Sequence, residues 1–263
     1  DTGNLNMFHQ SIGSLTLLDD YRRWRDRVFL DELFKSESRG QASDTQGGFY
    51  YPNGKGKTGV TVDTYTAAEF AAERYKFNVK TDLLEVVKSL RKRNVPVFQD
   101  GYYRCIADPS FMKDLRADQG FREVARYPGM GAPNPLMGMA SPNASLYQGG
   151  QYGQAQFVAG EPVMPSGFVF EGVRFFETTN MPSKTATVNY GDGAGAVTGR
   201  STPPGLFFGP QAVGVGIGGP NAQVLINNND DFSRFIILIW QLYAGFANLN
   251  KDFVTTAFTI VDP

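Results

Sequence analysis

The stretch that decides the fold spans Thr81–Tyr127 and reads TDLLEVVKSLRKRNVPVFQDGYYRCIADPSFMKDLRADQGFREVARY. Its pattern predicts a helix, a strand and a second helix, in that order. The strand is expected at Tyr102–Ala107, where aromatic and β-branched residues follow the turn signal Asp100-Gly101. The stretch therefore predicts a small α/β layer around which the rest of the chain is arranged.

The first helix is expected from about Asp82 to Arg93. Thr81 is its predicted N-cap, because a threonine hydroxyl can accept a hydrogen bond from a free amide of the first turn. Its charged side chains are expected on solvent faces, and Asn94 and Pro96 end it. The apolar face recurs at helical spacing and consists of Leu83, Leu84, Val86, Val87 and Leu90.

The second helix is expected to begin at Asp108-Pro109, since an acidic cap followed by proline at the first helical position is a favoured start. It is expected to end at Pro128-Gly129. Its predicted apolar face consists of Phe111, Met112, Leu115, Val124 and Ala125. Nothing in either helix or in the strand between them indicates catalysis.

A long amphipathic helix is predicted at Ser14–Phe34, upstream of this layer. One face carries Leu17, Tyr21, Trp24 and Val28, and arginines alternate with aspartates elsewhere along it. That alternation favours a solvated face with salt bridges over an RNA-binding arm. The flanking segments are expected to be extended at Asp1–Gly13, an irregular hairpin or loop at Ser36–Thr61 and a short helix at Thr66–Tyr75.

Downstream of the layer, the sequence predicts strands separated by long loops. Strands are expected at Phe168–Thr178, Leu206–Ile217, Phe232–Trp240 and Phe253–Ile260, and loops at Gly129–Gly160 and Asn180–Pro204. A loop as long as Gly129–Gly160 inside a compact domain usually has a function or a partner.

Composition excludes several classes of protein. The chain has 263 residues, a net charge of −1, one Cys and one His. A zinc site and a nucleophilic triad both need more such side chains than Cys105 and His9 supply, and no basic excess indicates sequence-specific nucleic-acid binding. The longest apolar run, Phe235–Trp240, is too short to span a bilayer.

Three motifs resemble known sites without matching them. Gly214–Gly219 fits the spacing of a dinucleotide fingerprint, but Pro220 follows where a helix should begin. Gly54–Thr58 lacks the first glycine of a phosphate-binding loop, since Tyr51 stands there. Asn227–Asp231 lacks the spaced oxygen ligands of a calcium loop, so a turn is expected. We therefore predict no catalytic residue, cofactor site or metal site.

Three blocks resemble the major capsid proteins of tailed bacteriophages, and more narrowly the coat family of N4-type phages. They are DPSFMKDLRADQGFREVARY at Asp108–Tyr127, FEGVRFFETTNMP at Phe170–Pro182, and the closing segment Asn229–Ile260. The resemblance implies an α+β chain with the Hong Kong 97 (HK97) capsid fold. Such a chain has a peripheral domain with a long spine helix and long antiparallel strands, and an axial domain with a mixed sheet flanked by helices.

On this resemblance, residues 1–79 and 222–249 form the peripheral domain, residues 80–221 form the axial domain, and residues 250–263 return to it. Family members normally carry an N-terminal arm and a long extended loop ahead of the spine helix, whereas this sequence begins just ahead of that helix. We therefore expect either a fragment or processed product, or neighbours that interlock by other means.

The resemblance also implies partners and contact residues. The chain is expected to assemble with itself, in the host cytoplasm, into pentamers and hexamers of an icosahedral shell that encloses phage DNA. Portal, scaffold and cement or decoration proteins are expected partners, DNA contact is expected to be non-specific, and no membrane is involved. The loop at residues 129–160 is expected at the capsomer axis, through Met137, Met139, Gln148, Gln151 and Gln154, and the spine is expected to pack on the closing strands through Leu17, Tyr21, Trp24 and Val28.

Two other classes of function stay open at this point. The chain could be an α/β hydrolase-like enzyme that uses scattered carboxylates, or a virion decoration or other oligomeric binding module. Electron microscopy would separate these from a coat subunit, because only the coat subunit forms closed shells, pentamers or hexamers.

Overall fold

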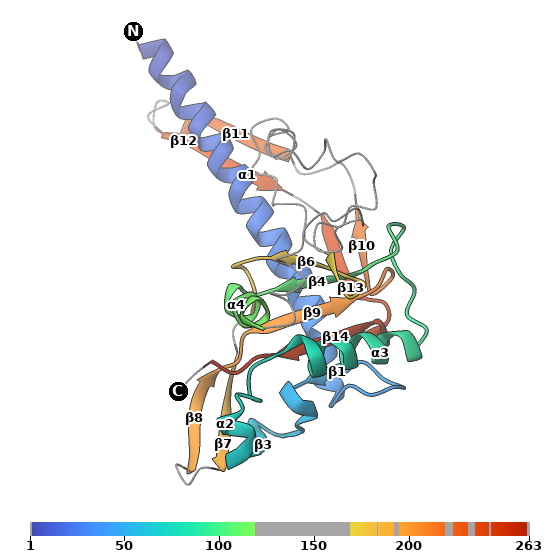
Figure 1. The fold of residues 1–263 in the computed structure, drawn as a ribbon. Coiled ribbons are helices and arrows are strands. Elements are labelled where there is room, and N and C mark those ends of the chain that lie inside the picture. Colours follow the sequence, from blue (N-terminus) through green and yellow to red (C-terminus); the bar gives the residue numbers. More distant parts are fainter. Residues whose placement is uncertain are drawn as a thin grey trace, which may run out of the picture.

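A six-stranded mixed sheet holds the molecule together (Figure 1), with the strand order β1-β14-β9-β4-β6-β5. The computed structural model describes residues 2–118, 169–182, 184–191, 195–218, 223–230, 235–241 and 243–261. The strands are β1 (Gly48–Tyr50), β4 (Tyr103–Ala107), β5 (Val169–Phe170), β6 (Val173–Glu177), β9 (Pro204–Phe208) and β14 (Val254–Phe258). The pairs β1/β14 and β4/β6 are parallel, and the other pairs are antiparallel.

Helices cover both faces of this sheet. On one face, α3 (Leu84–Lys92) and α4 (Pro109–Ala117) bury their apolar sides against it. On the other face lies the C-terminal part of α1 (Thr2–Phe34). Every residue of β9 and of β14 is consequently buried, as expected for strands that are covered on both sides.

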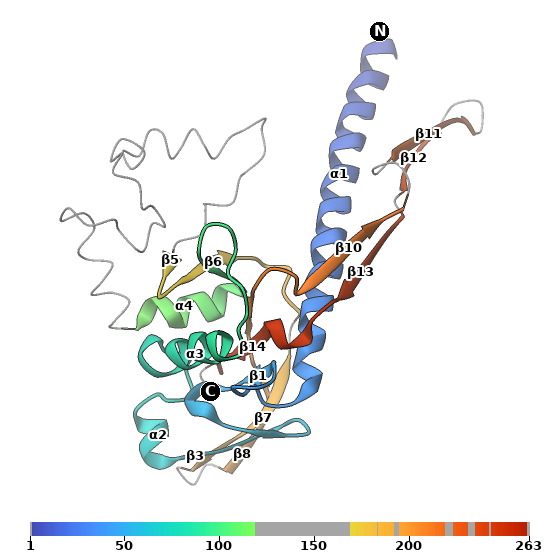
Figure 2. The same cartoon turned by 90° about the vertical axis from the view of Figure 1, so that its right-hand side faces the viewer.

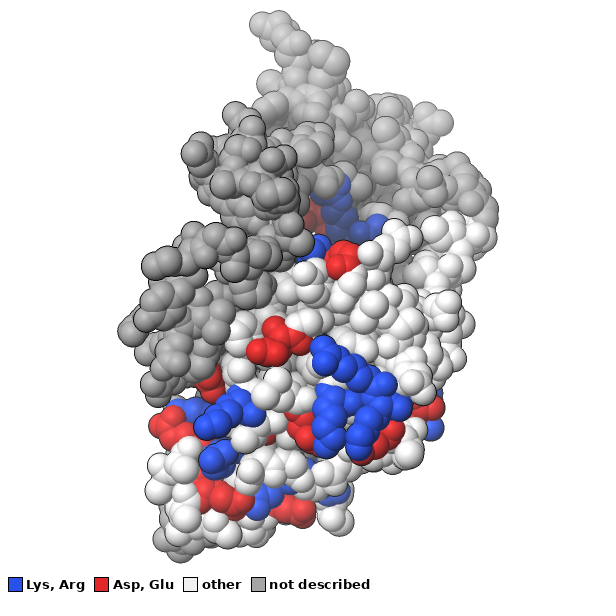
Figure 3. Space-filling view, turned by 45° about the vertical axis from the view of Figure 1, so that its right-hand side comes forward, with Lys and Arg blue, Asp and Glu red and all other residues white. Residues whose placement is uncertain are grey.

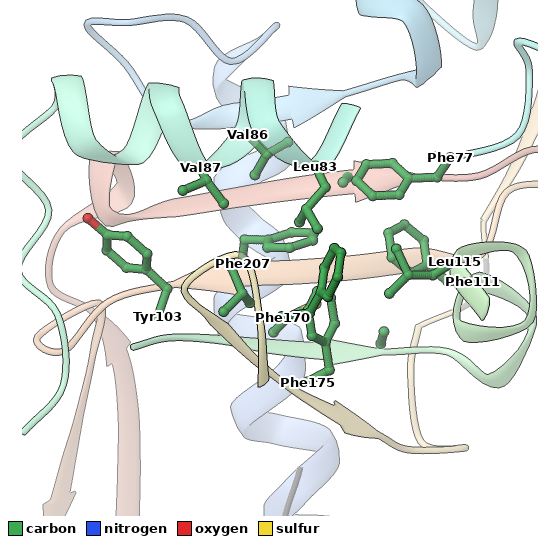
Figure 4. Packing of buried hydrophobic residues seen from close by; sticks show 14 of the residues in the cluster. Phe77, Leu83, Val86, Val87, Tyr103, Phe111, Leu115, Phe170, Phe175 and Phe207 are labelled. Carbon is green, nitrogen blue, oxygen red and sulfur yellow. The ribbon is translucent and has the colours of Figure 1, made fainter. Parts of the chain in front are cut away.

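The core under α3 and α4 is built mainly from aromatic rings (Figure 4). Phe207 of β9 lies at its centre, with ring centroids 6.0–6.3 Å from those of Phe77, Phe111 and Phe175. Gly205 lies two residues earlier, where an added Cβ would come within 2.9 Å of the Phe111 ring. Glycine at this position therefore allows α4 to pack closely on the sheet.

Two antiparallel ribbons accompany α1 as it extends away from the central sheet (Figure 2). The first ribbon pairs β10 (Val213–Ile217) with β13 (Ala244–Asn248), and the second pairs β11 (Gln223–Asp230) with β12 (Phe235–Gln241). A separate four-stranded sheet lies at the other end of the molecule, in the order β2-β3-β7-β8. Its strands are β2 (Lys57–Thr58), β3 (Thr61–Thr66), β7 (Thr185–Gly191) and β8 (Gly195–Ser201), and α2 (Ala67–Ala71) follows β3.

The α+β class is confirmed, and so are the elements with strong local signals. β4 forms where the strand was predicted, and α4 begins with Asp108 accepting a hydrogen bond from the Ser110 amide, with Pro109 in its first turn. The short helix α2 begins at a capping box formed by Thr66 and Glu69. The part of the second predicted helix beyond residue 118 lies outside the described residues.

The predicted start of the first helix was wrong. Asn78, rather than Thr81, caps a π-helical turn at Val79–Leu83 that leads into α3, and its side chain accepts hydrogen bonds from the Thr81 amide and hydroxyl. Leu84 was assigned to the apolar face but is 44% exposed. The wider π-helical turn shifts the helical phase, so Leu83 and Val86 face the core while Leu84 faces solvent.

Several predictions for irregular segments were also wrong. The segment Thr2–Gly13 is helical rather than extended, since Gly3 and Gly13 each cost only about 1 kcal/mol in a helix. A single strand was predicted at Phe168–Thr178, but its described residues form a hairpin of β5 and β6. Its turn is Glu171-Gly172, where both residues have the positive φ that tight hairpin turns require.

The remaining corrections concern strand pairing. Residues 180–204 were expected to form a loop but contain the hairpin β7–β8. Residues 206–217 were expected to form one strand, but they divide between β9 in the central sheet and β10 in the first ribbon. The glycine-rich segment at residues 36–61 was expected to be an irregular hairpin or loop, but it contains β1, which pairs with β14. In each case the strand forms because of a partner that is distant in sequence.

Replacing Phe207 with alanine is expected to lower the free energy of unfolding by about 3–5 kcal/mol, because a fully buried ring leaves a cavity among its neighbours. Urea denaturation measures the change. The control is Val97→Ala, whose side chain is 45% exposed and whose loss should change stability by less than about 0.5 kcal/mol. Equal midpoints for Phe207→Ala and the wild type would show that this ring is not the centre of the core.

Candidate interaction surface

A groove of about 310 Å³ runs between α1 and the first ribbon. The helix contributes one wall and the ribbon the other, through Tyr21, Arg25, Asp26 and Phe29 on α1 and Val215, Ile217, Ala244 and Phe246 on the two strands. The groove is therefore mostly apolar, with a charged pair at the helix side.

The sequence of β10 explains why the ribbon has one apolar face. Val213, Val215 and Ile217 alternate with Gly214 and Gly216, so the β-branched side chains of this strand share one face and glycines occupy the other. In the pairing with β13, Val215 lies opposite Phe246 and Ile217 lies opposite Ala244. These are the residues that line the groove.

The ribbon leaves much of its apolar surface exposed. On the valine face of β10, Val215 is 52% and Ile217 is 57% exposed. Tyr243 and Leu249, which flank β13, lie beside Gly218 and Gly214 on the opposite face and are 63% and 64% exposed. These four make up half of the eight large hydrophobic side chains that are exposed in the described part of the chain. A two-stranded ribbon is marginally stable alone, and exposed apolar side chains gathered on one ribbon indicate an interaction site.

Specific contacts fix the base of the ribbon to α1 and to the central sheet. The Asn248 side-chain amide donates a hydrogen bond to the Glu32 carbonyl at 3.3 Å, and Arg39 pairs with Asp252 at 2.7 Å just before β14. The Trp24 ring meets Phe246 edge-on, with 6.5 Å between centroids. The ribbon is therefore anchored at one end, while its apolar face stays open.

The predicted spine residues lie on the described part of α1, with one exception. Tyr21 lines the groove, Trp24 contacts Phe246, and all three of Tyr21, Trp24 and Val28 are half-buried. The side chain of Leu17 lies outside the described residues. The deeply buried residues of α1 come later, at Leu30, Leu33 and Phe34, where the helix meets the central sheet.

The predicted axis contacts cannot be placed. Met137, Met139, Gln148, Gln151 and Gln154 all lie outside the described residues. Sequence reasoning missed Val215 and Ile217, although the alternation V-G-V-G-I was a usable signal. It was read as part of a single strand from Leu206, so its separate apolar face was not recognised.

A buried carboxylate lies where the π-helical turn meets β1. The Oδ1 atom of Asp82 accepts hydrogen bonds from the Tyr50 hydroxyl at 3.1 Å and the Asn53 amide at 2.8 Å, and Oδ2 accepts one from the Asn78 amide at 3.1 Å. Asp82 was expected on a solvent face, but it is fully buried. Because Asp82 has no exposed surface, it cannot contact a substrate. Its role is structural, since its hydrogen bonds join the π-helical turn to Tyr50, Asn53 and Asn78.

The second buried carboxylate has a similar structural role. Glu37, just after α1, bonds to Lys57 of β2 and to Lys184 before β7. Burial raises the pKa of Glu37, but the hydrogen bonds from Lys184 and Lys57 outweigh it, and the pKa lies below its usual value. This ionic cluster joins α1 to the four-stranded sheet.

Asp82 makes stability depend on pH in a defined direction. Burial raises its pKa from 3.8 to about 6 despite the three hydrogen bonds to its oxygens. The folded protein therefore holds the proton more tightly than the unfolded chain, so this contribution is fully present below about pH 3.8 and is lost as pH rises through 6. A shift of about two units corresponds to a contribution on the order of 3 kcal/mol.

Urea unfolding of the wild type and of Asp82→Asn between pH 4 and pH 7 measures this contribution. The difference in unfolding free energy between the two proteins should shift in favour of the variant as pH rises through the window, because asparagine does not ionise. A difference that stays constant across the window would contradict the raised pKa.

Among the described residues, no group of three or more His, Cys, Asp or Glu side chains could hold a metal ion. Within the same residues, no helix is long and apolar enough to cross a membrane. Cys105 is fully buried in β4, and burial raises the pKa of its thiol. A buried, protonated thiol is a packing residue and a poor nucleophile.

Comparison with solved structures identifies the fold. The capsid structure of cyanophage P-SCSP1u matches with a TM-score of 0.50 and 14% identity, over 95% of this chain and 65% of that chain. The head structure of Helicobacter pylori bacteriophage KHP40 matches with a TM-score of 0.52 and 14% identity, over 97% of this chain and 69% of that one. The chain therefore has the fold found in phage capsids.

The matched segments span only about two thirds of those capsid chains. No family model matches the sequence, and no curated protein matches it significantly.

Proposed function

We propose that the chain is a major capsid protein of a tailed bacteriophage, which assembles with itself into the pentamers and hexamers of an icosahedral shell around phage DNA. The observation that carries the proposal is the structural likeness to two phage capsids over 95% and 97% of the chain. This likeness does not favour the two alternatives, an α/β hydrolase-like enzyme and a virion decoration or other binding module. The proposed function is structural and involves no catalysis.

We further propose the two-domain organisation of the HK97 fold. The peripheral part would consist of residues 1–79 and 222–249, the axial part of residues 80–221, with residues 250–263 returning to it. In support, α1 runs beside two antiparallel ribbons, and a mixed sheet flanked by α3 and α4 forms a distinct layer (Figure 2). Because β1 pairs with β14 and β3 pairs with β7 across these boundaries, the two parts cannot be independent folding units.

The exposed face of the first ribbon is the proposed contact between subunits. Val215 and Ile217 on this face are more than half exposed in the single chain, and the groove of about 310 Å³ beside them has room for side chains of a neighbour. Burying Val215 and Ile217 against another copy would stabilise assembly by about 1 kcal/mol or more for each side chain. The contact would also support a ribbon that has few partners within its own chain.

The double variant Val215→Asp/Ile217→Asp is expected to abolish closed shells, because two carboxylates would be buried without partners in the contact. The yield of shells, measured by electron microscopy and sedimentation, is the readout. Val97→Asp is the control, because Val97 is also about half exposed but does not line the groove. Shells formed at wild-type yield by the double variant would exclude this ribbon as the contact.

The loop at residues 129–160 is proposed to lie at the axis of each pentamer and hexamer. Its composition supports this, since Met137 and Met139 are unbranched and adaptable at contacts that differ between five-fold and six-fold rings. Gln148, Gln151 and Gln154 can form hydrogen bonds across a ring without repulsion between like charges. Portal, scaffold and cement proteins are further proposed partners, with assembly in the host cytoplasm and no membrane involved.

Met137→Asp/Met139→Asp should reduce the yield of capsomers and shells, because several copies of each new carboxylate would converge at the axis and repel one another. Met137→Leu/Met139→Leu is the size-matched control and should assemble normally. Native mass spectrometry and electron microscopy report the two stages separately. An unchanged yield and stability of capsomers and shells with the aspartate variant would remove this loop from the axis.

A further inference from the structure

The helical layer over the central sheet presents a basic outer surface. The segments Val79–Lys92 and Pro109–Ala117 carry six basic and three acidic side chains, a net charge of +3. The whole chain has a net charge of −1, so all remaining residues together carry −4. The six basic residues are Lys80, Lys88, Arg91, Lys92, Lys113 and Arg116, and every one is exposed.

Burial of the acidic side chains makes this surface more basic than the count indicates. Asp82 is fully buried, and Asp114 accepts a hydrogen bond from the Thr259 hydroxyl beneath α4. Among the acidic side chains of these two segments, Glu85 is the exposed one, and it pairs with Lys88 at 2.6 Å. Figure 3 shows, on the side of the molecule where α3 lies, Lys and Arg side chains gathered into one patch.

Half of the basic side chains are not neutralised. Lys88, Lys92 and Arg116 form ion pairs with Glu85, Asp44 and Glu177. Lys80, Arg91 and Lys113 form no ion pair with any described residue. These three charges come from both helical segments, so the unneutralised charge is spread over the layer instead of forming one binding pocket.

We propose that this basic layer is the surface that contacts double-stranded DNA. The inference rests on the proposed capsid function and assigns the side of the subunit that faces the interior of the shell. DNA is a dense polyanion, and lysines and arginines bind its phosphates by releasing condensed counterions. Phosphate contacts carry no sequence information, which suits side chains standing on convex helix surfaces with no groove for base edges.

Three side chains without an ion pair per subunit suit a shell that encloses DNA without binding it tightly at any one site. Three unneutralised side chains per subunit give weak binding by one copy, whereas many copies arrayed in a shell give a strong combined attraction. The first ribbon lies beside α1, away from α3 and α4 (Figure 2), and Val215 and Ile217 line the groove between the ribbon and α1. The two surfaces therefore separate contact with DNA from contact between subunits.

The test compares two triple variants that change the net charge equally. Lys80→Glu/Arg91→Glu/Lys113→Glu removes the proposed contacts. Arg23→Glu/Arg27→Glu/Lys35→Glu, called the α1 variant, places the same charge change on α1 and on the residue that follows it, where all three side chains are exposed. Binding of a 30-base-pair duplex is followed by fluorescence anisotropy between 50 and 200 mM NaCl. Circular dichroism and the thermal midpoint show whether each variant is folded.

The layer variant is expected to lose about ten-fold or more in affinity at the lowest salt concentration, and its salt slope should fall by about 2 to 3, since each lost phosphate contact removes about 0.9. The α1 variant should keep the wild-type slope. If both variants lost the same affinity for the duplex, the effect would come from net charge alone, and the proposal would be overturned. Tighter binding of the wild type to polyglutamate than to the duplex would also overturn it, in favour of an acidic protein partner.

The outcome can be separated from that of the capsid proposal. Shell formation by the wild-type chain is scored by electron microscopy, without DNA. Shells together with unchanged DNA binding by the layer variant would overturn only the DNA inference. A basic layer that binds DNA on a chain that never assembles would overturn the capsid function and, with it, the assignment of an inner side.

Discussion

The structure depends on burying two adjacent strands from both sides. β9 and β14 lie in the middle of the central sheet, and each of their residues is buried. Phe207 points into the core under α3 and α4, whereas Phe208 and Phe258 belong to the core that includes Leu33 of α1. Because these strands come from distant parts of the sequence, closing the sheet fixes the position of both helical layers.

This arrangement leaves the molecule with two different outer surfaces. The helices on one face of the sheet need their apolar sides for the core, so their basic sides point outward. On the other face, only the C-terminal turns of α1 are buried against the sheet. The preceding part of the helix runs beside a ribbon whose apolar face is only partly covered. Such a subunit has a well-packed core at the central sheet and partly exposed apolar side chains along α1 and the first ribbon. This is expected for a protein that buries those side chains when it assembles.

Local signals could be read from the sequence, and long-range ones could not. Asp108-Pro109 defined the start of α4 because the cap and the proline act within one turn. The strand β1 could not be predicted, because Gly48–Tyr50 becomes a strand only through pairing with β14, some two hundred residues later. The burial of Asp82 was not predicted for the same reason, since its hydrogen-bond partner Tyr50 comes 32 residues earlier in the sequence. The apolar ribbon face was missed because β10 was merged with β9, and only pairing with β13 separates them.

The exposed apolar side chains of the first ribbon would be buried only if this chain assembles with copies of itself. Electron microscopy of the purified protein, at concentrations high enough to favour association, tests this most directly. We expect closed shells, or pentamers and hexamers, in which the ribbon β10–β13 of each subunit contacts a neighbouring subunit. A monodisperse monomer at every concentration would contradict it.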